Sequence, residues 1–419
     1  MKRSSQRILT THVGSLVRPP EILRIILDKV SHKAYDAQAF ETAVRQAVKD
    51  VVRKQADIGI DVPSDGEFSK PGFSQYINER LGGLESSLPS PERANAPMNY
   101  PLLVEEFPNF MAQYQRMYRQ MWMPPEIPRE QVDEAIRLST GERAVVTGPI
   151  TYRGQAQVQR DIRNFRDALE GLTFEEAFIP SVTPSRNDAD PGHLYADEQQ
   201  YLYALADAMH EEYRTIVDAG FIVQLDLGLP ARNQVLPGKP APTWEELRRA
   251  SEMQVEAYNH ALRGIPQDRV RYHLCWGSMN TPHTSDIPLK DIVDLILGIN
   301  AQAYSIEAAN PRHEHEWMVW KDVKLPEGKI LIPGIISHQT NVVEHPELVA
   351  WRIKNYASVV GRENVIASTD CGFSQGWNMI RVHPEVQWAK LRALVEGARL
   401  ASQDLFGIDA RELTPARTL

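Results

Sequence analysis

The sequence predicts an α/β fold in which one parallel sheet closes into a (β/α)8 barrel of the TIM type. Short apolar runs of strand type alternate with helical segments along the 419 residues, and eight strands can be counted. No linker of low complexity divides the chain into halves. A chain of this length is too long for most single domains other than an α/β barrel. We therefore expect one domain over residues 1–419.

The eight expected strands are short and apolar, and several end in a polar or sulfur-bearing side chain. They are expected at residues 7–15, 60–64, 144–147, 221–226, 271–277, 303–307, 329–334 and 365–369. Between them, apolar residues recur at helical spacing, as Val44, Ala47 and Val51 do ahead of a stop signal at Gly59. Helices are expected at 37–58, 196–219, 243–261, 289–297, 345–360 and 385–402.

Two long insertions are expected after strands two and three, at about residues 84–128 and 151–192. In a (β/α)8 barrel such loops overhang the end of the barrel where active sites form. The first insertion holds a stripe of Met and aromatic residues at 110–123. We expect this stripe to cover the site as an apolar lid, with packing against the barrel wall or a second subunit as the alternative.

A histidine and a cysteine at the end of the fifth strand predict a metal site. His273 and Cys275 are two residues apart, so an extended strand points both side chains to one face. Glu307 ends the sixth strand and Cys371 follows the eighth. Because the strand ends of a (β/α)8 barrel face one mouth, we expect these four side chains to converge. Imidazole, thiolate and carboxylate suit zinc, and burial of both cysteines as small apolar side chains is the alternative.

Charge and hydropathy exclude several classes of partner. The chain carries 46 basic and 55 acidic residues, a net charge of −9, and lacks a basic run that could follow phosphates. No apolar run approaches ~18 residues, and no apolar segment follows the basic N-terminus. We expect no nucleic-acid partner, no membrane partner and a cytoplasmic location in which both cysteines stay reduced.

Six short motifs resemble, in the same order, those of the C-terminal catalytic barrel of cobalamin-independent methionine synthase. They are THVGS at 11–15, DGE at 65–67, QLD at 224–226, HLC at 273–275, SIE at 305–307 and DCG at 370–372. The resemblance implies that the four residues above are a zinc set. It also implies that Val13, Gly14 and Ser15 contact the carboxylate of homocysteine, and that Glu67 and Asp226 contact its amino group.

A shorter bacterial branch of that family, labelled methionine synthase II, shares two further stretches at 309–317 and 344–348. The epoxyalkane:coenzyme M transferases are similar to this branch. The full-length synthase also has a duplicate N-terminal barrel that helps to bind polyglutamyl folate, whereas we expect a single barrel here. Its proton donor is a histidine after strand seven, and the corresponding His338 lies one position early and lacks the neighbouring Asp. His313 and His315 are further candidate acids, with solvated surface as the alternative.

These features predict a zinc-dependent alkyltransferase that acts on a small thiol and an alkyl donor. An ordinary thiol is mostly protonated at neutral pH, so a zinc-bound thiolate would be the activated form. Glu307 would hold the fourth ligand position until the thiol arrives. The resemblance implies methyl transfer from a methyltetrahydrofolate to homocysteine. The alternatives are epoxide opening by coenzyme M, a metal-free decarboxylase on the related uroporphyrinogen decarboxylase barrel, and a zinc-binding protein without turnover; a homo-oligomer is compatible with each.

Overall fold

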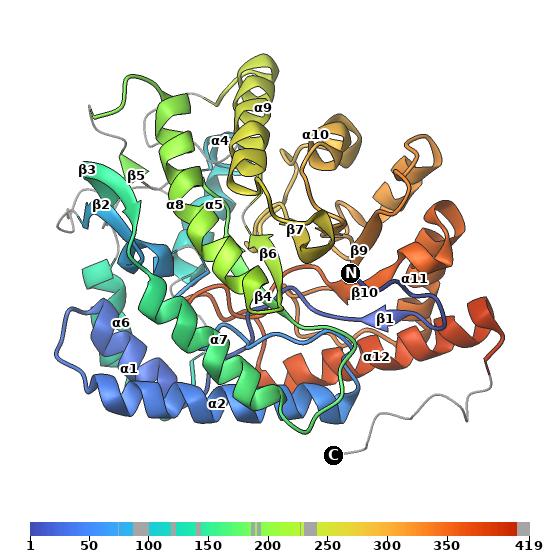
Figure 1. The fold of residues 1–419 in the computed structure, drawn as a ribbon, viewed down its shortest axis with the longest axis horizontal. Coiled ribbons are helices and arrows are strands. Elements are labelled where there is room, and N and C mark those ends of the chain that lie inside the picture. The colour runs from blue at the N-terminus through green and yellow to red at the C-terminus, as the bar shows by residue number, and fades with distance from the viewer. Residues whose placement is uncertain are drawn as a thin grey trace.

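The computed structural model of the chain is an α/β fold in which helices surround a curled sheet (Figure 1). It describes residues 1–73, 75–86, 100–118, 123–139, 144–185, 189–190, 194–226, 228–229 and 241–408. Within these ranges no helix combines the length and apolar character that crossing a membrane requires.

A parallel sheet of seven strands forms the centre of the molecule (Figure 1). Its strand order is β1-β10-β9-β8-β7-β6-β4, and all neighbours run parallel. The strands are β1 (Leu9–Thr10), β4 (Phe178–Val182), β6 (Ile222–Asp226), β7 (Val270–Leu274), β8 (Ala303–Ile306), β9 (Ile330–Ile336) and β10 (Ile366–Thr369). Every residue in them is buried, as in parallel sheets that are covered on both faces. The predicted α/β class and parallel sheet are confirmed.

Residues 60–64, the expected second strand, lie between the two edges of this sheet. On one side Val62 forms a parallel bridge with Thr11, just after β1. On the other side the Phe178 N–H, at the start of β4, donates to the Pro63 carbonyl oxygen at 3.1 Å. Pro63 has no N–H of its own, so the segment cannot make a complete ladder. It is nevertheless hydrogen-bonded to both edge strands.

A separate sheet of three strands departs from the prediction. β3 (Ala144–Tyr152) pairs antiparallel with β2 (Leu81–Ser86) and parallel with β5 (Ala189–Asp190). The prediction that residues 144–147 form the third strand of the parallel sheet is therefore wrong. The next strand of the parallel sheet after residues 60–64 is instead β4, which lies within the segment 151–192 that the sequence predicts as an insertion.

Burial and one proline explain this difference. Buried and more exposed residues mix along β3, as expected for a sheet with one open face. β4 is buried throughout, but its sequence holds Pro180, which weakens a strand prediction because proline cannot donate to a ladder. The same segment also contains α7 (Gln155–Leu169), which packs against α2 (Ala37–Ile58). Much of the predicted second insertion thus belongs to the main fold.

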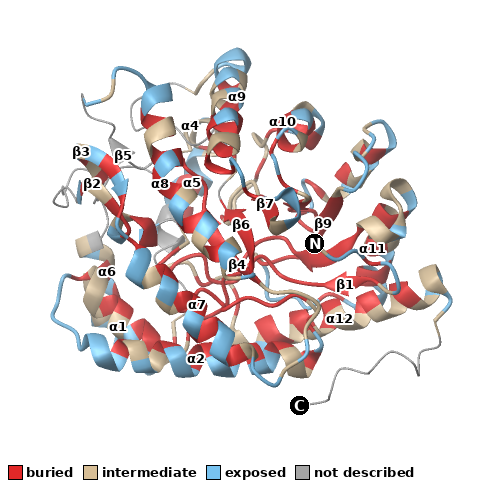
Figure 2. Cartoon of the chain, in the orientation of Figure 1, coloured by how far each residue is buried: buried red, intermediate tan, exposed pale blue. Residues whose placement is uncertain are grey.

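The helices pack with buried faces toward the sheet and exposed faces outward (Figure 2). The prediction for α2 is confirmed to the residue, because Asp36 caps its first N–H groups and Gly59, at φ 90°, ends it. The other surrounding helices are α1 (Pro20–Val30), α8 (Glu198–Asp218), α9 (Trp244–Ala261), α10 (Val293–Leu297), α11 (Pro346–Val360) and α12 (Pro384–Phe406). Short 3-10 helices are η1 (Gln75–Glu79), η2 (Gln267–Arg269), η3 (Leu289–Asp291), η4 (Glu314–Lys321) and η5 (Arg362–Asn364).

The first predicted insertion, 84–128, holds the end of β2 and two helices, α4 (Pro101–Glu106) and α5 (Pro108–Tyr118), and α6 (Arg129–Ser139) follows directly after it. Part of the Met and aromatic stripe lies on α5, and residues 119–122 fall outside the described residues. Met111 and Tyr114 are buried, and the Tyr114 hydroxyl accepts a hydrogen bond from the Asn280 N–H at 2.9 Å. Because residue 280 follows β7, α5 touches a loop at the carboxyl ends of the parallel strands.

Candidate metal and substrate site

Three side chains with metal-binding atoms meet at the carboxyl ends of two strands. The donor atoms of His273, Cys275 and Cys371 all lie within 4.8 Å of one another. His273 belongs to β7 and Cys275 follows it, so strand alternation points both side chains to one face. Cys371 stands two residues after β10. The structure therefore brings together three of the four predicted metal ligands.

The surroundings of His273 fit a metal ion. Its ring is fully buried, and Nδ1 makes a hydrogen bond with Ser305 Oγ at 3.1 Å. In the described part of the chain, Nε2 has no hydrogen-bond partner. An unpaired buried polar atom costs about 1–3 kcal/mol, and metal-ligating histidines commonly anchor their other ring nitrogen in this way. One imidazole nitrogen and two sulfurs are a donor set that suits zinc.

The two thiols influence one another. Interaction with the Cys275 thiol lowers the pKa of Cys371 well below its usual range, and His273 acts in the same direction. The same interaction, together with burial, raises the pKa of Cys275. One sulfur thus ionises readily beside an imidazole, and the thiolate is the form that binds zinc.

Glu307, the fourth predicted ligand, lies outside the cluster of three. One carboxylate oxygen accepts a hydrogen bond from the Trp276 backbone N–H at 2.9 Å, and the other accepts one from the Asn310 side chain at 3.0 Å. Burial raises its pKa, and these two hydrogen bonds oppose that rise. The side chain is therefore held near the cluster by protein groups.

The predicted carboxylate-binding turn packs directly against Glu67. Gly14 has φ 142°, and a Cβ there would lie 2.7 Å from Glu67 Oε1 and 2.6 Å from Pro180 Cγ, so only glycine fits. Glu67 also has a positive φ of 60° and is 1% exposed. Its Oε2 makes no hydrogen bond to any residue that the structure describes, and burial raises its pKa to about 7. Val13 and Ser15 flank Gly14 and are buried.

Asp226 is the second acidic group of the predicted substrate site. It ends β6, and burial raises its pKa to about 6, although His273 opposes the rise. Gln224 links this strand end to the turn, since its side-chain amide donates to the Val13 carbonyl at 2.5 Å and to Asp226 Oδ2 at 3.4 Å. Two buried carboxyl groups with raised pKa values favour a cation as their ligand.

A cavity of about 260 Å³ unites these strand ends. Ser15, Asp226, Cys275 and Cys371, which follow or end four different strands, all line it. Leu103 of α4 also lines it, so the first insertion contributes to its wall. Its volume suits a small molecule, and its lining combines apolar side chains with a few polar groups, as ligand sites do.

Comparison with known proteins gives the same assignment as the motifs. Residues 8–95 match the family described as cobalamin-independent synthase, catalytic domain. A protein named methionine synthase from Pyrococcus furiosus is 22% identical over 410 residues, which cover 94% of this chain and 93% of the relative. Over most of its length, the chain is therefore similar in sequence to a protein named methionine synthase.

Other methionine synthase relatives differ in length. The 5-methyltetrahydropteroyltriglutamate–homocysteine methyltransferase of Thermotoga sp. RQ2 is 22% identical over 385 residues, 88% of this chain but 42% of that relative. The chain thus spans less than half the length of this relative. A solved B12-independent methionine synthase from Shewanella sp. W3-18-1 has a TM-score of 0.67 and 18% identity, and the match covers 96% of this chain and 100% of the other. The two share a fold.

His338, the acid that the sequence predicts, is poorly placed to give up a proton. Its ring is fully buried, and neither nitrogen has a hydrogen-bond partner among the described residues. Burial lowers its pKa to about 4, so the imidazole is neutral at pH 7. A neutral imidazole is a weak acid, and the sequence prediction of His338 as proton donor gains no support from this environment.

Of a group of four buried ionisable side chains beside the cavity, sequence reasoning named only His313, as a candidate acid. His283 and Asp286 follow β7, while His313 and Glu316 lie at and within η4. The interpretation of His313 as solvated surface is wrong, because it is 3% exposed, whereas His315 is exposed. A usable signal was the pairing of each histidine with an acidic residue three positions later.

Arg18 is another buried residue of the site that the sequence motifs did not identify. Its fully buried guanidinium donates to the Glu67 carbonyl at 3.1 Å, the Lys70 carbonyl at 2.9 Å and the Ser374 carbonyl at 2.9 Å. These acceptors lie on two loops, one of which continues from Cys371. Arg18 therefore ties the Glu67 turn to the loop of a predicted metal ligand.

Proposed function

We propose that this chain is a zinc-dependent thiol alkyltransferase that methylates homocysteine. The observation that carries the proposal is the cluster of His273, Cys275 and Cys371, whose two cysteines line a cavity that also reaches Ser15 and Asp226. The printed names of the homologues supply the methyl transfer and the thiol. The proposal includes one domain with a complete (β/α)8 barrel, whose second strand is 60–64, since that segment is bonded to β1 and β4.

Zinc on these residues would supply a Lewis acid that keeps a bound thiol ionised near neutral pH. His273, Cys275 and Cys371 would be its permanent ligands. Glu307 would be the exchangeable fourth ligand, because Trp276 and Asn310 give its carboxylate a resting place away from the three. Ser305 would hold the His273 ring in the orientation that leaves Nε2 for the ion.

The acidic pair and the glycine turn would orient the amino acid. The ammonium group of homocysteine would lie between Glu67 and Asp226 and stabilise their ionised forms, which burial disfavours. The Gly14 turn and the Ser15 hydroxyl would bind the carboxylate. Leu103 and the neighbouring wall of the first insertion would exclude water, which strengthens electrostatic interactions at the reacting sulfur. A methyltetrahydrofolate is the alkyl donor that the homologues imply.

Calorimetric titration of the zinc-loaded protein with two thiols tests this assignment. We expect homocysteine to bind and coenzyme M to bind weakly, because coenzyme M has a sulfonate and lacks the amine that the acidic pair would recognise. Asp226→Asn should weaken homocysteine binding and leave coenzyme M binding unchanged. Tight binding of coenzyme M with no response to homocysteine would overturn the proposed substrate, and absence of zinc binding would overturn the mechanism.

A further inference from the structure

Two histidines share one carboxylate oxygen on the wall of the cavity. His283 Nδ1 lies 2.6 Å and His313 Nε2 lies 3.1 Å from the same atom, Asp286 Oδ2. The second nitrogen of each ring also faces an acceptor. His283 Nε2 lies 2.7 Å from the Met279 carbonyl oxygen, and His313 Nδ1 lies 2.8 Å from Glu316 Oε2. The four ionisable side chains form a closed group, which we term the His–Asp cluster.

These contacts determine the protonation of the rings. A neutral imidazole has one N–H and one acceptor nitrogen, whereas the imidazolium has two N–H groups. The Met279 carbonyl can only accept, and a carboxylate shared by two donors accepts from both. Both histidines of the cluster are therefore imidazolium ions. Two cations and two carboxylates balance, so the group is neutral as a whole although it is buried.

The charges around the cluster agree with this protonation. Burial lowers the pKa of His283, but Asp286 and then the Met279 carbonyl and Glu307 outweigh it and raise the pKa overall. In the same way Asp286, Glu316 and Glu307 raise the pKa of His313 to about 9 against the effect of burial. The neighbouring His338 stays neutral and adds no competing charge.

The cluster also belongs to the wall of the proposed reaction cavity. His283 and Asp286 line the cavity together with Cys275 and Cys371. His283 has φ 56°, a strained conformation for a residue other than glycine, and its two hydrogen bonds hold it there. His313 lies behind this wall, stacked on the Trp276 ring with centroids 3.7 Å apart and planes 13° from parallel.

We propose that His283 is the proton donor of the reaction and that Asp286 and His313 are positioning residues for it. This inference rests on the proposed function, because alkyl transfer from an amine requires that the leaving nitrogen be protonated. The sulfur–carbon bond forms with an electron pair from the thiolate, and the carbon–nitrogen bond breaks with its pair remaining on nitrogen. His283 gives to that nitrogen the Nε2 proton that otherwise bonds the Met279 carbonyl oxygen, keeps its Nδ1–H on Asp286, and is left neutral. The thiol loses one proton when it ionises and the leaving nitrogen gains one, so the reaction neither consumes nor releases protons overall.

Two methyl donors separate this role from a structural one. With homocysteine as acceptor, 5-methyltetrahydrofolate needs a proton on its leaving nitrogen, whereas methyl iodide releases iodide and needs none. His283→Gln should lower the rate with the folate about 10²- to 10⁴-fold and leave the rate with methyl iodide within a factor of two or three. In wild-type protein the folate rate should fall as pH rises through the pKa of His283, and the variant should lose this limb.

A matched control exists on α9, where His260 pairs with Asp207 at 2.7 Å outside the lining of the cavity. His260→Gln should leave both rates unchanged. Should His283→Gln fail to fold, Asp286→Asn keeps the side-chain shape and should show the same donor-selective loss at smaller size. Equal loss with both donors, or no loss with the folate, would overturn the inference alone. Wild-type protein that takes no methyl group from the folate would overturn the proposed function, and the inference with it.

Discussion

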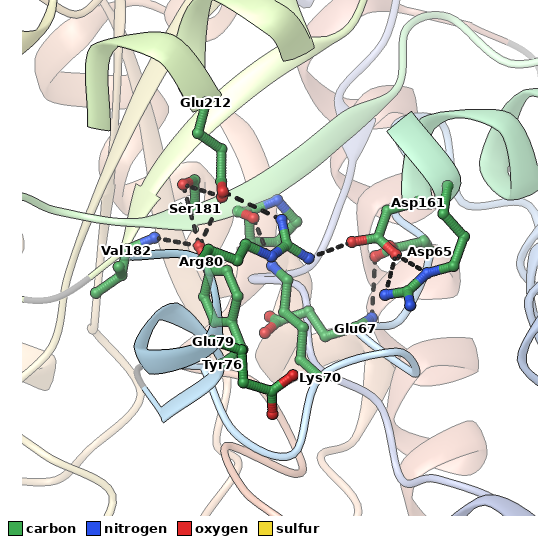
Figure 3. A network of polar contacts seen from close by, with 12 residues as sticks. Asp65, Glu67, Lys70, Tyr76, Glu79, Arg80, Asp161, Ser181, Val182 and Glu212 are labelled. Atoms are coloured by element: carbon green, nitrogen blue, oxygen red, sulfur yellow. Dashed lines mark hydrogen bonds and ion pairs between the residues drawn. The ribbon is translucent and has the colours of Figure 1, made fainter. Parts of the chain in front are cut away.

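Two buried polar regions of this molecule differ in whether their side chains have partners. Around Arg80 every strong charge is matched: the guanidinium pairs with Glu212 at 3.1 Å and with Asp161, and the Tyr152 hydroxyl donates to Glu212 at 2.7 Å. Figure 3 shows Tyr76 and Ser181 beside Glu212 in this network, where both hydroxyls donate to Glu212 Oε1, at 2.9 and 2.8 Å. In the candidate site, by contrast, Glu67 Oε2 and His273 Nε2 lack hydrogen-bond partners within the described ranges.

The two regions also differ in the pKa values of their buried carboxyl groups. Burial alone would raise the pKa of Asp161 and Glu212, but the Arg80 guanidinium outweighs it and lowers both. Among the described residues neither Glu67 nor Asp226 has an ion-pair partner, and burial raises their pKa values to about 7 and about 6 although Lys70 opposes the rise. A paired buried network stabilises the fold, whereas unpaired buried groups destabilise it until a ligand binds. The contrast therefore marks where a ligand belongs.

Breaking the paired region should have the largest effect on stability. Arg80→Met leaves the buried Glu212 carboxylate without its cation and leaves Asp161 with Arg160 alone, and it should lower the free energy of unfolding by about 3–5 kcal/mol. Denaturant unfolding of wild type and variant measures this. The exposed pair Lys33–Glu134 is the control, and Lys33→Met should cause no measurable change. A small effect of Arg80→Met would mean that the network contributes little to stability.

The variant Glu67→Gln tests whether an unpaired buried carboxyl group makes stability depend on pH. A carboxyl group whose folded pKa is raised from 4.5 to about 7 contributes stability that is fully present below pH 4.5 and is lost as pH rises through 7. Glu67 should thus account for a loss of up to about 3 kcal/mol between these values in the ligand-free wild type. Glu67→Gln should remove this part of the slope and leave the part that Asp226 causes. Unfolding midpoints at pH 4.5, 6 and 7.5 test it. An identical slope in the variant would show that Glu67 is not the responsible group.

Tyr114→Phe should have the smallest effect. It removes one hydrogen bond between α5 and the loop after β7, worth about 1 kcal/mol. If the first insertion covers the cavity, turnover should fall a few-fold while zinc content stays unchanged. A folded variant with unaltered turnover would argue that α5 does not act as a cover.

Local signals account for what the sequence predicted well. The spacing of apolar residues, the Asp36 cap and the stop at Gly59 fix α2 without help from the rest of the chain. Strand alternation likewise places His273 and Cys275 on one face. Within the His–Asp cluster, the pairing of each histidine with an acid three positions later is also a local signal. The contact between the two pairs is not, because it joins the loop after β7 to η4 and depends on the neighbouring positions of β7 and β8. The sequence analysis did not predict β4 because Pro180 interrupts its strand pattern.

Zinc stoichiometry tests the central claim most directly. Freshly reduced wild-type protein should bind close to one zinc ion per chain, measured by metal analysis after removal of loosely bound ions. Cys371→Ser and Cys275→Ser should lose most of this zinc. Glu307→Ala should lose less, because only an exchangeable ligand is removed. Wild-type protein that binds no zinc, or cysteine variants that retain it fully, would contradict the account.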